Sequence, residues 1–159
     1  MILVSSCLLG LKTRYDGKAN DNSIIMNYSH LGKYIPVCPE QLGGLSTPRE
    51  PAEITEGSGE DVLDGKSNVV TNTGEDGTEY FIRGAEEVLN LAKTFPVKAA
   101  ILKDRSPSCG VNRIYNGDFS STIQNGQGVT AAILRKHGIP IYSEEDVTED
   151  ILKELLLKL

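Results

Sequence analysis

The stretch Ala99-Ala100-Ile101-Leu102-Lys103-Asp104-Arg105-Ser106-Pro107-Ser108-Cys109-Gly110 joins an apolar run to a loop that is dense in reactive side chains. An uninterrupted apolar run of this kind is typical of a strand that is covered on both faces. The residues that follow it supply cations, hydroxyls, a carboxylate and a thiol. We therefore expect a core strand over 98–102 whose C-terminal end opens onto a functional loop around Cys109.

Two further cysteines occupy comparable places in the chain. Cys7 closely follows the apolar run Ile2 to Ser5, and Cys38 directly follows the short run Tyr34 to Val37. Both runs have the length and composition of short strands. The sequence thus predicts three strands, each with a thiol just beyond its C-terminal end.

Segments with helical spacing of apolar residues separate these strands. They run from Asp21 or Asn22 to Gly32, from Thr78 to Pro96, over 129–136, and through a last helix capped by 143–146. A fourth strand is expected over 139–142, and 39–76 reads as an irregular excursion with small antiparallel strands. This order predicts an α/β fold, a Rossmann-like three-layer sandwich with a mainly parallel sheet. The sequence contains no stretch typical of a domain linker, so we expect 1–159 to be a single domain.

Composition and charge argue against two classes of protein, those that bind nucleic acid in bulk and those that span a membrane. The formal net charge of -6 argues against a broad basic face, so bulk binding of nucleic acid is not expected. The apolar run at Met1 to Val4 is far too short for a signal peptide or a membrane span. We expect a cytoplasmic protein without a membrane partner.

An odd number of cysteines argues against a disulfide framework in a reducing compartment. Buried thiols, a reactive thiol and metal ligation all stay open, because free cysteine also behaves as a small hydrophobe. The carboxyl ends of parallel strands line one crevice, so Cys7, Cys38 and Cys109 are expected on the same rim. Three thiolates there would hold a soft metal or an iron–sulfur cluster and leave one coordination position free. His30 and His137 are expected near helix C-termini rather than as a fourth ligand.

Polar residues beside the cysteines are candidates for proton transfer and charge stabilisation. Glu40, two residues after Cys38, is the best general acid/base candidate, since desolvation there would raise its pKa. Ser106 suits hydrogen bonding to a developing charge, although a turn role is open and Ser108 is adjacent. Asp16, before Gly17, is expected to form a turn.

Basic residues near the thiols would favour thiolates and offset the charge of a cluster. Those closest in sequence to Cys7 or Cys109 are Lys12, Arg14, Lys103, Arg105 and Arg113. Gly126-Gln127-Gly128 precedes a predicted helix, a place where anions bind, but it lacks a full phosphate-loop pattern. We expect it to serve loop geometry.

Taken in order, several motifs resemble those of the thiouracil desulfidase family, and the resemblance covers nearly the whole chain. The motifs are Ser6-Cys7-Leu8-Leu9-Gly10, Arg14-Tyr15-Asp16-Gly17, Val37-Cys38-Pro39-Glu40, Pro48-Arg49-Glu50, Lys103 to Gly110 and Gly128-Val129-Thr130-Ala131-Ala132. The resemblance implies a 4Fe–4S cluster held by Cys7, Cys38 and Cys109, with one iron not bound by protein. It also implies that Glu40 and Ser106 are the catalytic carboxylate and hydroxyl.

The activity implied by this resemblance is removal of sulfur from a thiolated pyrimidine. Thiouracil would give uracil and hydrosulfide by hydrolysis without net redox change. We expect the chain to hold only the core domain, so a small thiolated nucleobase or nucleoside is the expected partner, and the oligomeric state stays open. Two alternatives use the same thiols: a metal- or sulfide-binding protein without hydrolytic activity, and a zinc hydrolase. A shared accessible cavity for the three sulfurs is the first requirement of the cluster hypothesis.

Overall fold

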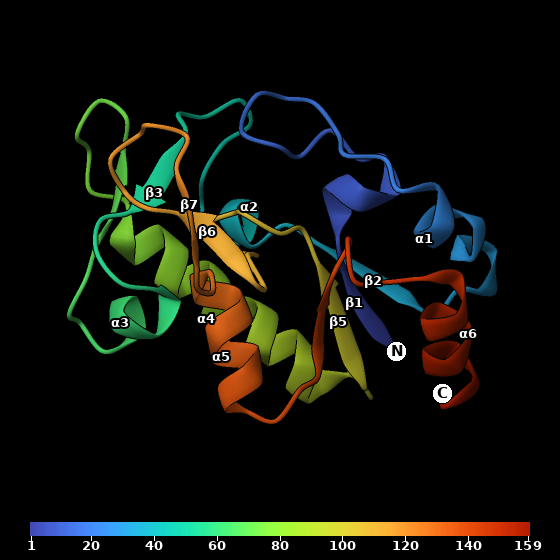
Figure 1. The fold of residues 1–159 in the computed structure, drawn as a ribbon. Coiled ribbons are helices and arrows are strands. Elements are labelled where there is room, and N and C mark those ends of the chain that lie inside the picture. Colours follow the sequence, from blue (N-terminus) through green and yellow to red (C-terminus); the bar gives the residue numbers. More distant parts are fainter.

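A four-stranded parallel sheet forms the centre of the computed structural model, which describes all of residues 1–159 (Figure 1). Its strands are β1 (Ile2–Ser5), β2 (Tyr34–Val37), β5 (Ala99–Leu102) and β8 (Ile141–Ser143). They lie in the order β2-β1-β5-β8, and every neighbouring pair is parallel. The four predicted strands are therefore confirmed, and β2 has the predicted bounds.

Successive side chains of the central strands point to opposite faces of the sheet, so alternate residues belong to two separate hydrophobic cores. Leu3 of β1 and Ala100 and Leu102 of β5 belong to the larger core, on the face covered by α4 (Thr78–Thr94) and α5 (Val129–Lys136). Val4 and Ile101 belong to the smaller core, beneath α1 (Ser23–Asn27) and α6 (Glu149–Leu157). Helices thus cover both faces, which confirms the three-layer sandwich.

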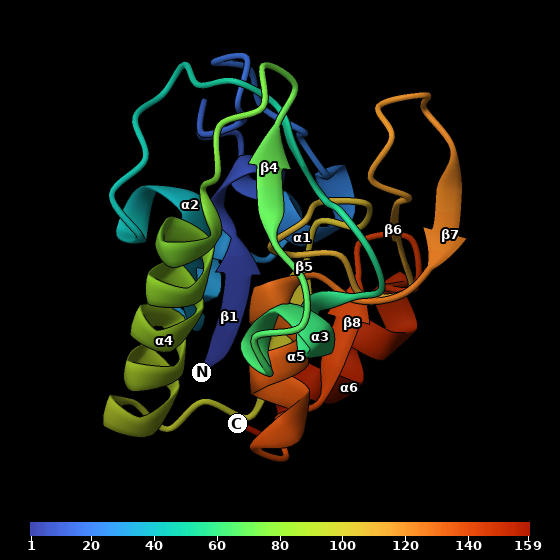
Figure 2. The ribbon, with the colours of Figure 1, turned by 90° about the vertical axis from the view of Figure 1, so that its left-hand side faces the viewer.

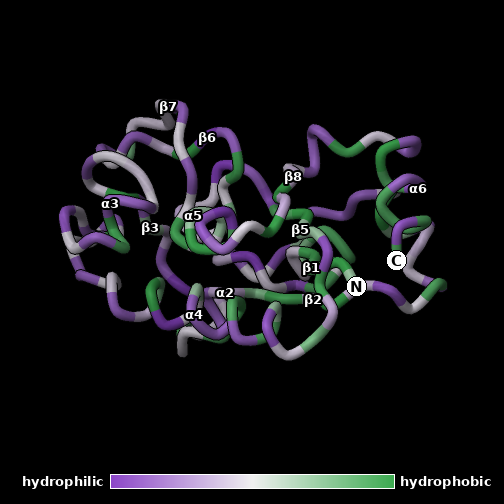
Figure 3. Tube along the Cα trace, turned by 90° about the horizontal axis from the view of Figure 1, so that it is seen from below, coloured by the Kyte–Doolittle hydropathy of each residue, from purple (hydrophilic) through white to green (hydrophobic).

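The apolar stretches concentrate in the middle of the molecule, over β1, β5 and α5, while the outlying loops are largely hydrophilic (Figure 3). None of the helices has both the length and the apolar character that a membrane crossing needs.

The excursion after β2 contains two short helices as well as the expected antiparallel strands. These elements are α2 (Pro39–Leu42), β3 (Ala52–Ile54), α3 (Gly59–Leu63) and β4 (Val69–Thr71), with β3 and β4 antiparallel. Helix α2 lies against α4 so closely that a Cβ at Gly84 would come within 2.0 Å of the Pro39 carbonyl oxygen. This contact fixes the segment that follows Cys38.

Three further features differ from the sequence prediction. The first predicted helix is split into α1 and the 3-10 turn η2 (Ser29–Leu31), although Asn22 does cap it by accepting a hydrogen bond from Ile25 N at 3.1 Å. The last helix is capped by Thr148, because Ser143 and Asp146 instead bond to each other across a turn. The hairpin β6 (Arg113–Tyr115) and β7 (Ile123–Asn125) was not predicted, since its strands are short and half polar.

The loops that leave β1 and β6 rise at the same end of the molecule, above the C-terminal ends of the parallel strands (Figures 1 and 2). A 3-10 turn, η1 (Ser6–Leu9), follows β1 directly, and α2 follows β2 after one residue. Open parallel sheets bind their ligands at this edge. A ligand site is therefore expected at the C-terminal ends of β1, β2 and β5.

Candidate active site

A cavity of about 520 Å³ lies at these strand ends, and all three cysteines line it. Cys7 comes from η1, Cys38 from the start of α2, and Cys109 from the loop after β5. Cys7 and Cys109 are only 9% and 5% exposed. None of the three forms a disulfide. The structure thus brings together residues that are up to 102 positions apart in the sequence.

Cys7 is oriented by the tight turn that follows β1, which ends at Gly10 in the left-handed conformation, with φ at 86°. Burial raises the pKa of its thiol. A hydrogen bond from Asn20 and the charge of Lys103 oppose this rise. The neutral thiol is thus the stable form in the protein alone, and donors are in place for the thiolate.

Cys38 occupies the N-cap position of α2, where backbone N–H groups have no helical partner. Burial raises the pKa of this thiol, while the backbone N–H groups of Gln41 and Glu40 and the charge of Arg49 oppose the rise. The Arg49 guanidinium lies 3.9 Å from the sulfur. A helix N-terminus and a cation together form a favourable setting for a thiolate.

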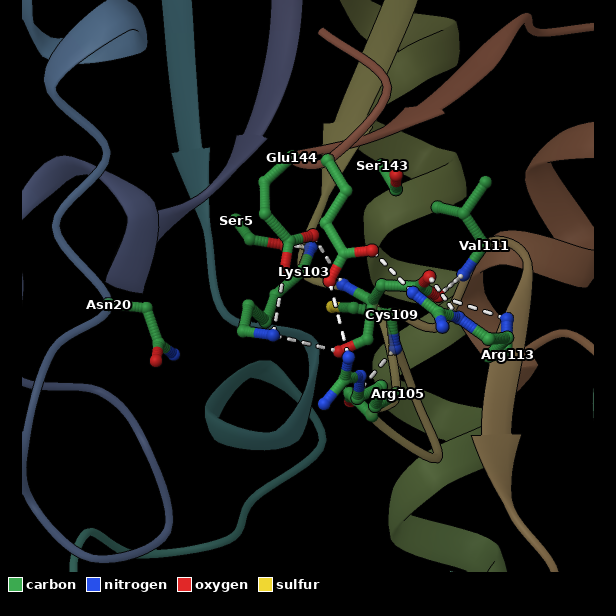
Figure 4. Close-up of polar contacts among 12 residues, drawn as sticks. Ser5, Asn20, Lys103, Arg105, Cys109, Val111, Arg113, Ser143 and Glu144 are labelled. Atoms are coloured by element: carbon green, nitrogen blue, oxygen red, sulfur yellow. Dashed lines mark hydrogen bonds and ion pairs between the residues drawn. The ribbon is translucent and has the colours of Figure 1, made fainter. Parts of the chain in front are cut away.

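Cys109 is the most buried of the three, and burial strongly raises the pKa of its thiol. A hydrogen bond from Ser5 opposes this rise, and Ser5 Oγ in turn accepts from the Lys103 backbone N at 3.0 Å. Negative charge on Cys38, Cys7 or Glu40 raises the pKa of Cys109 further. Figure 4 shows Ser5, Lys103 and Cys109 gathered at the end of the sheet, with Asn20 approaching from a separate loop.

The groups that oppose the rise in pKa therefore differ between the sulfurs: Asn20 for Cys7, the α2 N-terminus with Arg49 for Cys38, and Ser5 for Cys109. Hydrogen bonds to coordinating thiolates are the means by which proteins tune metal centres. No group of three His, Cys, Asp or Glu side chains converges closely enough to hold a single metal ion. The thiols instead surround a shared volume.

Glu40 projects from the first turn of α2 into the cavity, and its side chain is 18% exposed. Burial raises the pKa of its carboxyl, and the neighbouring Arg49 opposes this effect. Arg49 Nε donates to Glu40 Oε1 at 3.3 Å, whereas no hydrogen bond within the protein engages Oε2. One carboxylate oxygen is thus anchored and the other is free to exchange a proton.

Arg49 connects this carboxylate to a cysteine, a role that its position in the sequence did not reveal. Its side chain is 6% exposed, and it also donates to Thr13 O at 2.8 Å and to Thr47 Oγ1 at 2.7 Å. A buried guanidinium with its donors satisfied in this way is rigid, because its planar fork fixes the directions of its bonds. Arg49 therefore fixes Glu40 relative to Cys38.

Ser106 and Ser108 have different surroundings. Ser106 lines the cavity, and its Oγ accepts from the backbone N atoms of Ser108 and Cys109 at 3.1 and 3.0 Å. Ser108 is fully buried away from the cavity, where its hydroxyl pairs with Thr130 Oγ1 at 2.9 Å. Of these two serines, only Ser106 can present its hydroxyl proton to a molecule in the cavity.

Asp104 organises the Cys109 loop, a role that the sequence analysis missed. Its carboxylate is 2% exposed, and Oδ1 accepts from the backbone N atoms of Val111, Asn112 and Arg113 at 2.9, 3.1 and 3.1 Å. These three bonds hold the chain just after Cys109 in a fixed curve. The signal available in the sequence was a carboxylate placed directly between a buried strand and a cysteine loop.

We expect Asp104→Ala to destabilise the protein by roughly 2–4 kcal/mol, because buried N–H donors would lose their acceptor. Asp104→Asn keeps one acceptor oxygen and should recover part of this loss. Urea unfolding of the cluster-free protein measures both changes in the free energy of unfolding. An Asp104→Ala variant as stable as the wild type would contradict this role.

Glu144 approaches the loop from beyond β8 and was also missed. Its carboxylate bonds to Lys103 Nζ at 2.7 Å and accepts from Asp104 N at 2.7 Å (Figure 4). Because β8 ends at the same edge of the sheet as β5, a residue just after it is in reach of the site. Of the cations expected near the thiols, Lys103 is the one whose charge lowers the pKa of Cys7.

Three of the other expected cations have acidic partners, whereas Lys12 is exposed and does not line the cavity. Arg14 pairs with Asp16 at 2.9 Å, and Arg105 and Arg113 pair with Glu145. Asp16 also accepts from Lys18 N at 3.1 Å, which confirms the predicted turn.

Both histidines lie outside the cavity and bond to backbone carbonyls near helix ends, as predicted. Gly128 serves loop geometry, because a Cβ there would come within 2.4 Å of the Ser108 backbone.

Comparison with known proteins identifies the class to which this fold and cavity belong. The profile of the 2-thiouracil desulfurase family matches residues 2–146. The chain therefore belongs to the 2-thiouracil desulfurase family and is an enzyme with desulfidase function.

Two individual proteins are similar over nearly their whole length. The uncharacterized protein YbbK of Bacillus subtilis (strain 168) is 49% identical over 149 residues, which cover 94% of this chain and 99% of YbbK. A solved structure of TudS, described as a [4Fe-4S]-dependent thiouracil desulfidase, is 41% identical with a TM-score of 0.85. That match covers 98% of this chain and 97% of TudS.

Proposed function

We propose that this protein hydrolyses thiolated pyrimidines, converting thiouracil and water to uracil and hydrosulfide without net redox change. We further propose that Cys7, Cys38 and Cys109 hold a 4Fe–4S cluster, one iron of which has no protein ligand. The observation that carries the proposal is that three thiols from three separate strand ends line one cavity together with Glu40 and Ser106. The [4Fe-4S] dependence of TudS supports it.

The donor set fits an iron–sulfur cluster better than a zinc ion. Zinc binds sulfur at about 2.3 Å, so its ligands must converge on one point. No three side chains do so here, whereas in a cluster each thiolate binds a separate iron and the thiols need only surround it. When bound, such a cluster would supply a soft Lewis acid for the sulfur of the substrate. The zinc hydrolase alternative is therefore the weaker one.

Glu40 is proposed to act as the general acid/base. Its Oε2 would take a proton from the attacking water and later return it to the departing sulfur or the ring. Two observations support this role: burial raises the pKa of the carboxyl, and Arg49 fixes Oε1 while leaving Oε2 free. The carboxylate would thus change protonation state without changing position.

Ser106 is proposed to orient the substrate and to stabilise charge that develops on the ring. Its oxygen is already fixed by two backbone N–H groups, so its own proton is available to a bound molecule. This arrangement favours Ser106 over Ser108, whose hydroxyl is buried against Thr130.

The volume of the cavity, about 520 Å³, supports a small thiolated nucleobase or nucleoside as the substrate. We infer that the chain forms one desulfidase-like domain over 1–159 and acts in the cytoplasm, where free thiols remain reduced. The net charge of -6 supports a small-molecule substrate rather than bulk nucleic acid.

The decisive experiment is anaerobic reconstitution with iron and sulfide, followed by incubation with 4-thiouracil, 2-thiouracil and thiouridines. We expect visible charge-transfer absorption, about four irons per chain, loss of thiocarbonyl absorbance and release of sulfide. A colourless protein that retains stoichiometric zinc would contradict the cluster. A loaded protein that turns over none of these compounds would favour the alternative of a metal- or sulfide-binding protein.

A further inference from the structure

The turn of the β6–β7 hairpin places an aromatic side chain at the cavity. Phe119 lies in this turn, between Tyr115 and Ile123, and it lines the cavity although 38% of its surface is exposed. The turn rises beside β3 at the end of the molecule that holds the cysteines (Figure 1). Phe119 belongs to neither hydrophobic core, so packing of the fold does not account for it.

The backbone that carries Phe119 is held in an unfavourable conformation. Phe119 has φ at 56° and Ser121 has φ at 59°, in the left-handed region that residues with a Cβ rarely adopt. Such strain persists only where the surrounding structure enforces it, and it concentrates at ligand sites. Both strained residues line the cavity.

Glu53 of β3 enforces this conformation. Its side chain is largely buried, and Oε1 accepts from Gly117 N at 2.9 Å and from Phe119 N at 3.3 Å. Gly117, with φ at 97°, lies so close to β3 that a Cβ there would come within 2.4 Å of the Ile54 carbonyl oxygen. The turn is thus tied to β3, and the backbone that carries Phe119 is held at the cavity.

We propose that Phe119 is a substrate-binding residue that stacks on the pyrimidine ring of the substrate, and that Glu53 is its positioning residue. This inference rests on the proposed function. A flat aromatic face attracts every nucleobase through stacking and needs no hydrogen bond to do so. Phe119 would therefore hold the ring while the groups around the three cysteines act on its sulfur substituent.

Phe119→Leu tests the stacking because leucine keeps an apolar side chain and the same backbone strain but has no flat face. Calorimetry with uracil as an unreactive ligand, and steady-state kinetics with 4-thiouracil, should show Kd and KM raised at least about fivefold, the lower end of base–aromatic stacking. Phe119→Tyr keeps the flat face and should raise Kd and KM less than Phe119→Leu does. Iron content should be unchanged in both variants.

Phe95→Leu is the matched control, since Phe95 is 44% exposed at the end of α4 and does not line the cavity. If Phe119→Leu changes Kd and KM no more than Phe95→Leu does, the stacking role is overturned. If the wild type itself binds no uracil and turns over no thiouracil, the proposed function fails instead, so the two failures are distinguishable.

Glu53→Ala tests the positioning role. It should raise KM to the level of Phe119→Leu with kcat at saturation largely kept, and Glu53→Gln should restore KM because its amide oxygen still accepts from the turn. Adding Glu53→Ala to Phe119→Leu should raise KM no further, since both changes remove the same interaction. Additive effects would overturn the assignment of Glu53.

Discussion

A Cys109→Ser variant will bind less than about one iron per chain after anaerobic reconstitution, against about four for the wild type. Serine is close to cysteine in size, but its oxygen is a harder ligand and does not ionise at neutral pH. Burial already raises the pKa of the Cys109 thiol, so a hydroxyl at this site is still less able to become an anion. Iron and sulfide analysis together with visible absorption measures the loss.

The matched control for this change is Ser108→Ala, one residue away. Ser108 is buried against Thr130 rather than in the cavity, so this variant should retain its iron despite a cost of about 1 kcal/mol for the lost hydroxyl pair. Thermal unfolding of cluster-free Cys109→Ser should resemble that of cluster-free wild type. Full iron content in Cys109→Ser would show that Cys109 is not a cluster ligand.

Glu40→Gln is expected to lower kcat by about 10²- to 10⁴-fold, the usual contribution of a general acid or base. Glutamine has the same shape, and its amide oxygen can still accept the hydrogen bond that Arg49 Nε donates to Oε1. The amide at the other position cannot take up a proton. Sulfide release from 4-thiouracil measures the rate, and iron content should equal that of the wild type.

Glu86→Gln, an exposed position on α4, makes the same chemical change away from the cavity and should leave kcat unchanged. Two results would count against the acid/base role of Glu40. Full turnover in Glu40→Gln would show that no proton passes through this side chain. Loss of iron in Glu40→Gln would show instead that the carboxylate supports the cluster.

Local sequence patterns predicted much of the fold because its central strands are short, apolar and buried on both faces. The run at 99–102 and the residues after it indicated a strand followed by a site, and α5 has the predicted bounds of 129–136. The pattern failed where tertiary contacts outweigh periodicity. Helix α2 has a single turn and forms against α4, and the β6–β7 hairpin is tied down by Glu53.

The residues of the site also fall into a group that the sequence predicted and a group that it did not. Cys7, Cys38, Cys109, Glu40 and Ser106 were identifiable because each lies within a few residues of a predicted strand end, and the structure places all five around one cavity. Arg49, Glu53, Glu144 and Phe119 were not predicted in their roles. Arg49, Glu53 and Phe119 line the cavity from segments outside the predicted strand ends, and Glu144 contacts Lys103 from beyond β8. A local sequence pattern does not show which distant segments come together.

The sequence by itself determined the parallel core, the edge of the sheet at which the cavity lies, and the thiols and carboxylate that line it. Alternating burial and the direction of parallel strands are local consequences of residue type, so they can be deduced from the order of residues. Only the tertiary structure decided how those groups are held. A buried guanidinium between Glu40 and Cys38, a carboxylate that curves the Cys109 loop and a strained turn that carries Phe119 all depend on chain segments brought together by folding.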